Sequence, residues 1–294
     1  MHRFATAFLL FVLAALPAAR ALDVFNYSAA ANERFSSGFP NSPVVNPSFF
    51  LAGYDLSGLG WTSGNFGVTL ISPQHLLTAA HVSAGTTVSF LSLTGTVQSY
   101  TVDSSYTVLH SAGVNTDLKI VRLTAPIAPG DQVNYFPTLL LNSVSDYLGL
   151  TVASFGAGQR AGLNTIDAAG VVDMLPFGTG NGTADNVVFI TDYDAVTGQT
   201  QGASGDSGSP SFVGVGGSLA LIGTHSAIVD ASPDQTIDVL IPAYFGQINA
   251  RLALDGYAFG TYVSAIPEPS TWGALVGLVV LALACHRRGK VKSD

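Results

Sequence analysis

The chain has 294 residues, of which 48% are hydrophobic and only 10% are charged, and its formal net charge is −8. Between Leu22 and Ala265, five basic residues stand against seventeen acidic ones, which leaves this region near −12. Such an acidic region argues against nucleic acid or anionic membrane surfaces as partners, because both repel negative charge. Cys285 is the only cysteine, so no intramolecular disulfide can form, but a chain of this length can bury a core without one.

The first 21 residues have the pattern of an export signal. A short basic start precedes an apolar run over residues 4–16, and Ala19 and Ala21 suit cleavage by signal peptidase after Ala21. The apolar run is too short for an ordinary membrane span. We therefore expect a signal peptide over residues 1–21 and an exported mature protein.

The region that follows is predicted to be rich in strands. Residues 22–47 have weak periodicity and many Ser, Asn, Ala and Pro residues, which indicates a leader or an N-terminal arm packed on the domain. Further along, short apolar runs alternate with turn residues, and we expect strands over 66–71, 76–80, 86–91, 96–102, 118–123, 150–155, 170–175, 187–191, 218–229 and 236–241. No long helical pattern interrupts them, so the fold class is all-β, a barrel or a sandwich. The one good helix candidate is 243–254, entered by Pro242.

Three segments carry the residue types of nucleophilic catalysis. Leu-Thr-Ala-Ala-His ends at His81, Asp117 precedes the alternating apolar run 118–123, and Gly-Asp-Ser-Gly contains Ser207. A serine hydroxyl is a poor nucleophile at neutral pH unless a neutral imidazole takes its proton, and a buried carboxylate must hold that imidazole in the right tautomer. Asp103 competes for the carboxylate role, but only Asp117 precedes such a run, which would anchor it at the end of a strand.

Taken singly, Ser207 fits an ordinary turn and His81 a core histidine, but the three segments in this order resemble the chymotrypsin/trypsin family of serine proteases. The resemblance implies two antiparallel β-barrels of the chymotrypsin type followed by a C-terminal helix. It places His81 and Asp117 in the first barrel and Ser207 in the second, with the boundary within 124–148. On this basis we expect a trypsin-like domain over residues 48–264.

The same resemblance implies an exported serine endopeptidase that acts on polypeptides and needs no cofactor or metal. The backbone N–H groups of Gly205 and Ser207 would form its oxyanion hole, which stabilises the charge of the tetrahedral intermediate. Two other functions stay open. One is a catalytically inactive surface protein that uses the protease fold for binding, and the other is an esterase with the same triad.

The residues expected around the specificity pocket give opposing indications. Gln201, six residues before the nucleophile, would lie at the pocket base and is neither an acid nor a small apolar residue. The string Ile-Gly-Thr-His, which contains Thr224 and His225, is similar to a motif of bacterial glutamyl endopeptidases whose histidine meets a substrate carboxylate. Asp238 is a further candidate for the pocket wall and would instead favour a basic side chain. We therefore assign no substrate residue, and an ordinary strand histidine remains an equal alternative for His225.

Activation is also open at this stage. In trypsin-like zymogens a freed apolar N-terminus, often Ile-Val-Gly-Gly, pairs with the aspartate beside the nucleophile, here Asp206. Residues 44–47, Val-Val-Asn-Pro, are the nearest candidate and match poorly. The expected partner of Asp206 is a side chain or a different N-terminus.

The C-terminal end carries three features in order: a Pro-Glu-Pro box at 267–269, an apolar stretch over 273–285 and a basic cluster over 286–290. Together they resemble the PEP-CTERM sorting signal of Gram-negative bacteria. The resemblance assigns residues 265–294 to sorting and implies an exosortase-type processing enzyme as a partner, with secretion or display at the cell surface or in the extracellular matrix. At 13 residues the apolar stretch is short for a span, so the membrane contact through this helix is transient or anchored with help from its flanks. A plain C-terminal anchor is the alternative.

A calcium site is a minor alternative at one acidic stretch. Asp185, Asn186, Asp192 and Asp194 lie close in sequence, but they lack the regular spacing of a dedicated calcium loop. In an acidic protein such residues are more often solvated, so we expect no metal.

Overall fold

Six antiparallel strands of the first half close into a barrel in the computed structural model, which describes residues 22–111, 113–175 and 185–263. Around the barrel the order is β4-β5-β6-β9-β8-β7, and β7 pairs with β4 to complete the ring. The strands are β4 (Leu59–Thr62), β5 (Gly67–Ser72), β6 (His75–Ala79), β7 (Thr87–Leu91), β8 (Val97–Ser111) and β9 (Val114–Leu123). Alternate apolar side chains of these strands fill the interior, among them Val68, Leu70, Leu76, Val88, Phe90 and Val121.

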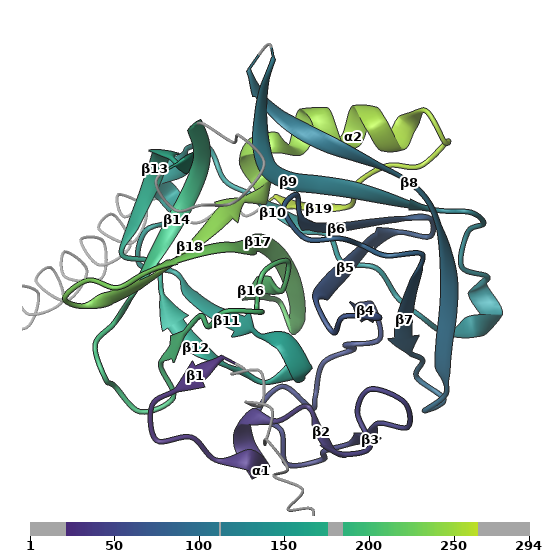
Figure 1. Cartoon of the computed structure of the whole chain (residues 1–294), viewed down its shortest axis with the longest axis horizontal. Coiled ribbons are helices and arrows are strands. Elements are labelled where there is room, and N and C mark those ends of the chain that lie inside the picture. The colour runs from purple at the N-terminus through teal and green to yellow at the C-terminus, as the bar shows by residue number, and fades with distance from the viewer. Residues whose placement is uncertain (1–21, 112, 176–184, 264–294) are drawn as a thin grey trace, which may run out of the picture.

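The second half forms a nine-stranded sheet beside the barrel (Figure 1). Seven strands run in the order β12-β11-β16-β17-β18-β14-β13, each antiparallel to its neighbours. The short strand β10 pairs with β17 in parallel, and β19 pairs with β10, also in parallel. Their bounds are β10 (Thr138–Leu140), β11 (Thr151–Phe155), β12 (Ala161–Thr165), β13 (Ala168–Asp173), β14 (Asp185–Tyr193), β16 (Pro210–Val215), β17 (Ser218–Val229), β18 (Asp234–Leu240) and β19 (Thr261–Val263). The two β-sheet bodies are those of the chymotrypsin-type fold.

The largest apolar cluster lies where the two bodies meet. It combines Leu77 and Ile120 of the barrel with Phe155 and Phe212 of the second sheet, and Phe136 packs on Phe212 at 4.7 Å between ring centroids. Burial of this shared surface holds the two bodies against each other, because it removes apolar area from water on both sides. Side chains from both halves of the chain meet along this shared surface.

The N-terminal arm runs beneath both bodies (Figure 1) and contains β1 (Asp23–Val24), α1 (Ala29–Asn32), β2 (Phe35–Ser37) and β3 (Val44–Val45). Strand β1 pairs with β15 (Thr200–Gln201) of the second half. The buried guanidinium of Arg34 donates to the Leu56 and Leu59 carbonyls and to Gln159 Oε1. The arm is therefore tied to both bodies.

The C-terminal helix α2 (Phe245–Ala253) begins two residues later than the helix expected from the sequence. Residues 241–244 form a 3₁₀ turn in front of it, with Pro242 in the first turn, where its missing N–H leaves no helical hydrogen bond unmade. Ile248 and Leu252 are buried beneath α2, which packs on the long strand β8 of the barrel. No helix in the described ranges is both long and apolar enough to cross a membrane.

The strand predictions agree with the structure in most places, and the differences have local causes. Strand β8 extends to Ser111, nine residues beyond the expected end, because it forms a long hairpin with β9. Strands over 59–62, 161–165 and 210–215 were not expected, because glycine and polar residues interrupt their apolar pattern. The expected signal peptide and sorting tail lie outside the described residues.

Candidate active site

His81 and Asp117 meet at one end of the first barrel. His81 follows β6, and its Nδ1 lies 2.7 Å from Oδ2 and 2.9 Å from Oδ1 of Asp117, which is on β9. The backbone N–H of His81 also donates to Asp117 Oδ1 at 3.0 Å. Asp117 is completely buried, whereas the His81 side chain is 22% exposed. This geometry fixes the Nδ1–H tautomer and leaves Nε2 directed away from the carboxylate.

Two further groups hold Asp117 from the second half of the chain. The Ser226 hydroxyl on β17 donates to Asp117 Oδ2, and Asn186 Oδ1 on β14 accepts the Asp117 backbone N–H at 2.8 Å. The carboxylate thus lies at the junction of the two bodies, with donors from both. Both oxygens of this buried carboxylate are hydrogen-bonded, which offsets the cost of removing it from water.

Lys119 fixes the turn that carries His81. Its side chain crosses from β9, and its Nζ donates to the carbonyls of Ala80, at 3.2 Å, and Val82. These two residues flank His81 on either side. Burial lowers the pKa of the Lys119 ammonium, and the nearby Asp117 partly offsets this effect.

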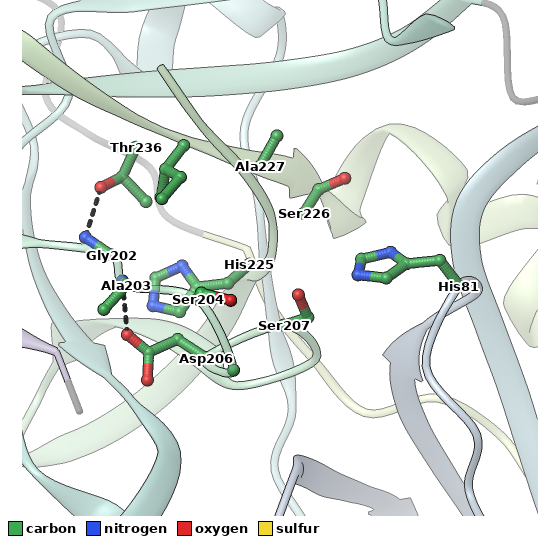
Figure 2. A pocket seen from close by; sticks show the side chains of 12 residues that line it. His81, Gly202, Ala203, Ser204, Asp206, Ser207, His225, Ser226, Ala227 and Thr236 are labelled. Carbon is green, nitrogen blue, oxygen red and sulfur yellow. Dashed lines mark hydrogen bonds between the residues drawn. The ribbon is translucent and has the colours of Figure 1, made fainter. Parts of the chain in front are cut away.

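Ser207 lies in the loop before β16, and its side chain faces the His81 ring across one pocket (Figure 2). The next residue, Gly208, has φ +83° and approaches the barrel so closely that a Cβ would collide with Thr78 Oγ1 and lie 2.8 Å from the Gly67 carbonyl. Only glycine fits both the left-handed backbone and the contact. Gly208 therefore presses the serine loop against β5 and β6, next to the turn of His81.

The backbone around Ser207 offers donors to the same pocket. Gly205 has φ +104°, and neither its N–H nor that of Ser207 bonds to an acceptor among the described residues. The intervening Asp206 N–H is taken by the Ala203 carbonyl at 3.0 Å. Two free N–H groups beside a serine hydroxyl are the donors that an oxyanion would need.

Asp206 also lines the pocket, and backbone N–H groups hold its buried carboxylate. Its carboxylate accepts the N–H groups of Ala157 and Ala203, both at 2.7 Å, and a backbone bond from Leu22. Leu22 is fully buried at the start of the described chain, and it is Leu22, not residues 44–47, that bonds to Asp206. Burial raises the pKa of Asp206, and these bonds together with His225 act in the opposite direction.

His225 and Asp238, which gave opposing indications in the sequence, form one buried pair. His225 Nδ1 bonds to Asp238 Oδ1 between the neighbouring strands β17 and β18. Burial lowers the pKa of the imidazole, but the charges of Asp238 and Asp206 outweigh it and leave the pKa above its ordinary value. Of the four residues expected at the pocket, His225 lines it, whereas Gln201, Thr224 and Asp238 do not.

Comparison with protein families identifies the family of this fold. The family model described as trypsin matches residues 57–248, which is more than half of the chain. The chain belongs to the trypsin family. A second model, the PEP-CTERM protein-sorting motif, matches residues 265–288, and this motif marks an exported protein. The search of curated proteins found none that matches the chain.

In this trypsin-family chain the competing candidates lie away from the pocket. Asp103 is exposed on β8 and pairs with Arg122 at 2.7 Å. Asp185 and Asn186 begin β14, whereas Asp192 is near its other end, so the calcium candidates do not converge. Within the described residues, no group of three His, Cys, Asp or Glu side chains is arranged to hold a metal ion.

Four residues of the site were not identified from the sequence. Asn186 was considered only for calcium, and Lys119, Leu22 and Ser226 were not assigned any role. Ser226 directly follows His225, so its place on the strand was visible in the sequence. The other three contact residues that are at least 37 positions away in the sequence, and no local sequence pattern predicts such contacts.

Proposed function

We propose that this trypsin-family protein is an exported serine endopeptidase that uses Ser207, His81 and Asp117. The observation that carries the proposal is the bond between His81 Nδ1 and the buried Asp117, with Ser207 facing the same ring in one pocket. Ser207 Oγ attacks the substrate carbonyl carbon while His81 Nε2 takes the hydroxyl proton. Asp117 holds the ring and stabilises the imidazolium that forms.

The remaining steps use the same groups. The N–H groups of Gly205 and Ser207 bind the oxyanion, and His81 returns its proton to the leaving amine as the peptide C–N bond breaks. Water then attacks the acyl-enzyme with His81 again as the base, which releases the carboxylate product and restores the Ser207 hydroxyl. No cofactor is needed for this sequence of steps.

A non-catalytic binding protein and an esterase are the alternatives. The proposal of an enzyme is favoured because a binding surface has no need of the Asp117 bonds that orient His81, nor of free donors beside Ser207. Peptide and activated ester substrates pass through the same acyl-enzyme, so their hydrolysis must be compared directly.

The test is hydrolysis of an unstructured polypeptide by wild type and by three variants. Ser207→Ala should abolish cleavage, and Asp117→Asn should lower kcat by up to about 10⁴ because the ring takes the wrong tautomer. Asp103→Asn is the matched control and should keep full activity, since Asp103 is an exposed partner of Arg122. Undiminished turnover by Ser207→Ala, or inactivation by Asp103→Asn alone, would contradict the proposal.

For delivery we propose cleavage by signal peptidase after Ala21 and recognition of the tail by an exosortase-type enzyme in a Gram-negative envelope. The PEP-CTERM match supports the second step. Deleting residues 266–294 should leave proteolysis unchanged and move the protein to the free soluble fraction. Mass spectrometry should find a mature C-terminus near the Pro-Glu-Pro box. A native chain ending at Asp294 would instead support a plain membrane anchor.

A further inference from the structure

The pocket beside Ser207 is bounded by two stretches of the second body. The backbone of 202–204 forms one side, and residues 226–228 of β17 form the other, with Thr236 of β18 between them. Figure 2 shows Gly202 and Thr236 together at the end of the pocket away from His81. A substrate side chain held next to Ser207 would extend toward this end.

The side chains of Ile228 and Thr236 narrow the end of the pocket at Gly202. The Gly202 N–H donates to Thr236 Oγ1 at 2.8 Å, which holds the Thr236 side chain against the side of the pocket formed by residues 202–204. A Cβ placed on Gly202 would lie 3.0 Å from Ile228 Cγ2 and 3.1 Å from Thr236 Cγ2, so both methyl groups already pack against the Gly202 backbone. The methyl groups of Ile228 and Thr236 therefore narrow the end of the pocket that a long substrate side chain would have to enter.

The titratable residues nearest to this end of the pocket are almost completely buried. His225 is 4% exposed, its Nδ1 bonds to Asp238, and its Nε2 is buried without a hydrogen-bond partner among the described residues. Asp238 is 1% exposed behind it. A substrate carboxylate would approach two existing carboxylates, Asp238 and Asp206. A substrate cation would find neither of them free, since Asp238 bonds to His225 and Asp206 accepts the N–H groups of Ala157 and Ala203. Burying either unpaired charge here is costly.

We infer that the pocket of this enzyme selects a small uncharged side chain, such as that of alanine, serine or valine, immediately before the cleaved bond. This inference rests on the proposed peptidase activity and adds its substrate class. One or two excess methylene groups in a closed apolar pocket change discrimination by about 10–200-fold.

The test uses the full chain and a set of peptides that differ only in the residue before the cleaved bond: Ala, Val, Phe, Arg or Glu. We expect kcat/KM for Ala and Val to exceed that for the other three by at least about tenfold. A highest value for Glu would make His225 the substrate-binding group, and a highest value for Arg would do the same for Asp238. Either result, or a preference for Phe, overturns the inference.

A variant that opens the pocket adds an independent readout. Ile228→Ala combined with Thr236→Ser removes both methyl groups but keeps the hydroxyl that binds Gly202, so the ratio of Phe to Ala cleavage should rise at least about tenfold. Val171→Ala, on an exposed part of β13, is the control and should leave the ratio unchanged. An unchanged ratio in the double variant contradicts the inference. If a fluorophosphonate labels Ser207 but none of these preferences is found, the inferred substrate preference is wrong and the proposed peptidase function stands. If there is neither labelling nor hydrolysis, both the proposed function and this inference are wrong.

Discussion

Ser226 on β17 of the second body donates its hydroxyl hydrogen to Asp117 on β9 of the first barrel. The Asp117 carboxylate, which orients His81, is therefore bound from both halves of the chain: by His81 from the barrel and by Ser226 from the second body. Asn186 adds a second bond from the second half, to the Asp117 backbone N–H. The orientation of His81 therefore depends on correct docking of the two bodies.

Ser226→Ala should lower kcat by about 10–100-fold with little change in KM, because a hydrogen bond to a charged group contributes about 1.5–3 kcal/mol. Ser218→Ala, at the exposed start of the same strand, is the control and should behave as wild type. Steady-state kinetics on one peptide substrate measures both. Full kcat in Ser226→Ala would mean that the barrel alone positions Asp117.

Lys119→Met should also lower kcat more than it raises KM, by about tenfold, because the carbonyls of Ala80 and Val82 lose the ammonium that fixes the turn around His81. Lys119 contacts these backbone groups rather than the substrate pocket, so it acts as a positioning residue. Lys119→Arg keeps the charge and several donors and should recover part of the rate. A loss of thermal stability with unchanged kcat would assign Lys119 a purely structural role.

The His225–Asp238 pair predicts a defined pH dependence of stability. Because the pKa of His225 is raised in the folded protein, its stabilising contribution is fully present below the ordinary imidazole pKa of about 6.5 and is lost as pH rises through the raised value. Urea unfolding of wild type and His225→Gln from pH 5 to 9 should show a difference in the free energy of unfolding that shrinks toward alkaline pH. A difference that is constant or grows with pH would show that the folded ring is neutral.

The buried position of Leu22 beside Asp206 predicts that the N-terminus matters for activity. A mature chain that begins at Leu22 carries a free ammonium group there, and this group would neutralise a carboxylate that burial makes costly. A chain that begins at Arg20 should have at least about tenfold lower kcat/KM than one that begins at Leu22. Asp206→Asn should remove this difference. Equal activity of the two chains with Asp206 intact would argue that the Leu22 amide suffices.

Most barrel strands, though not β4, and the segments that carry His81, Asp117 and Ser207 could be predicted because each has a local signature. The alternating run after Asp117 and the glycine on each side of the Asp206–Ser207 pair are properties of a few neighbouring residues. The pocket could not be predicted in the same way. Gln201 was expected at the base of the pocket, but its backbone pairs with Asp23 of β1 and it does not line the pocket. Thr236 and Ile228 lie at that end instead. His225 and Asp238 each suggested a substrate charge in isolation, and only their register on neighbouring strands reveals that they bind each other.

The central claim is that His81 activates Ser207 as the nucleophile, and covalent labelling tests it most directly. The full chain is treated with a fluorophosphonate, digested and mapped by mass spectrometry, alongside Ser207→Ala and His81→Ala. We expect one adduct, on Ser207, that is absent from Ser207→Ala and that forms several powers of ten more slowly in His81→Ala. An adduct on another serine, or an equal rate of Ser207 labelling without His81, would contradict it.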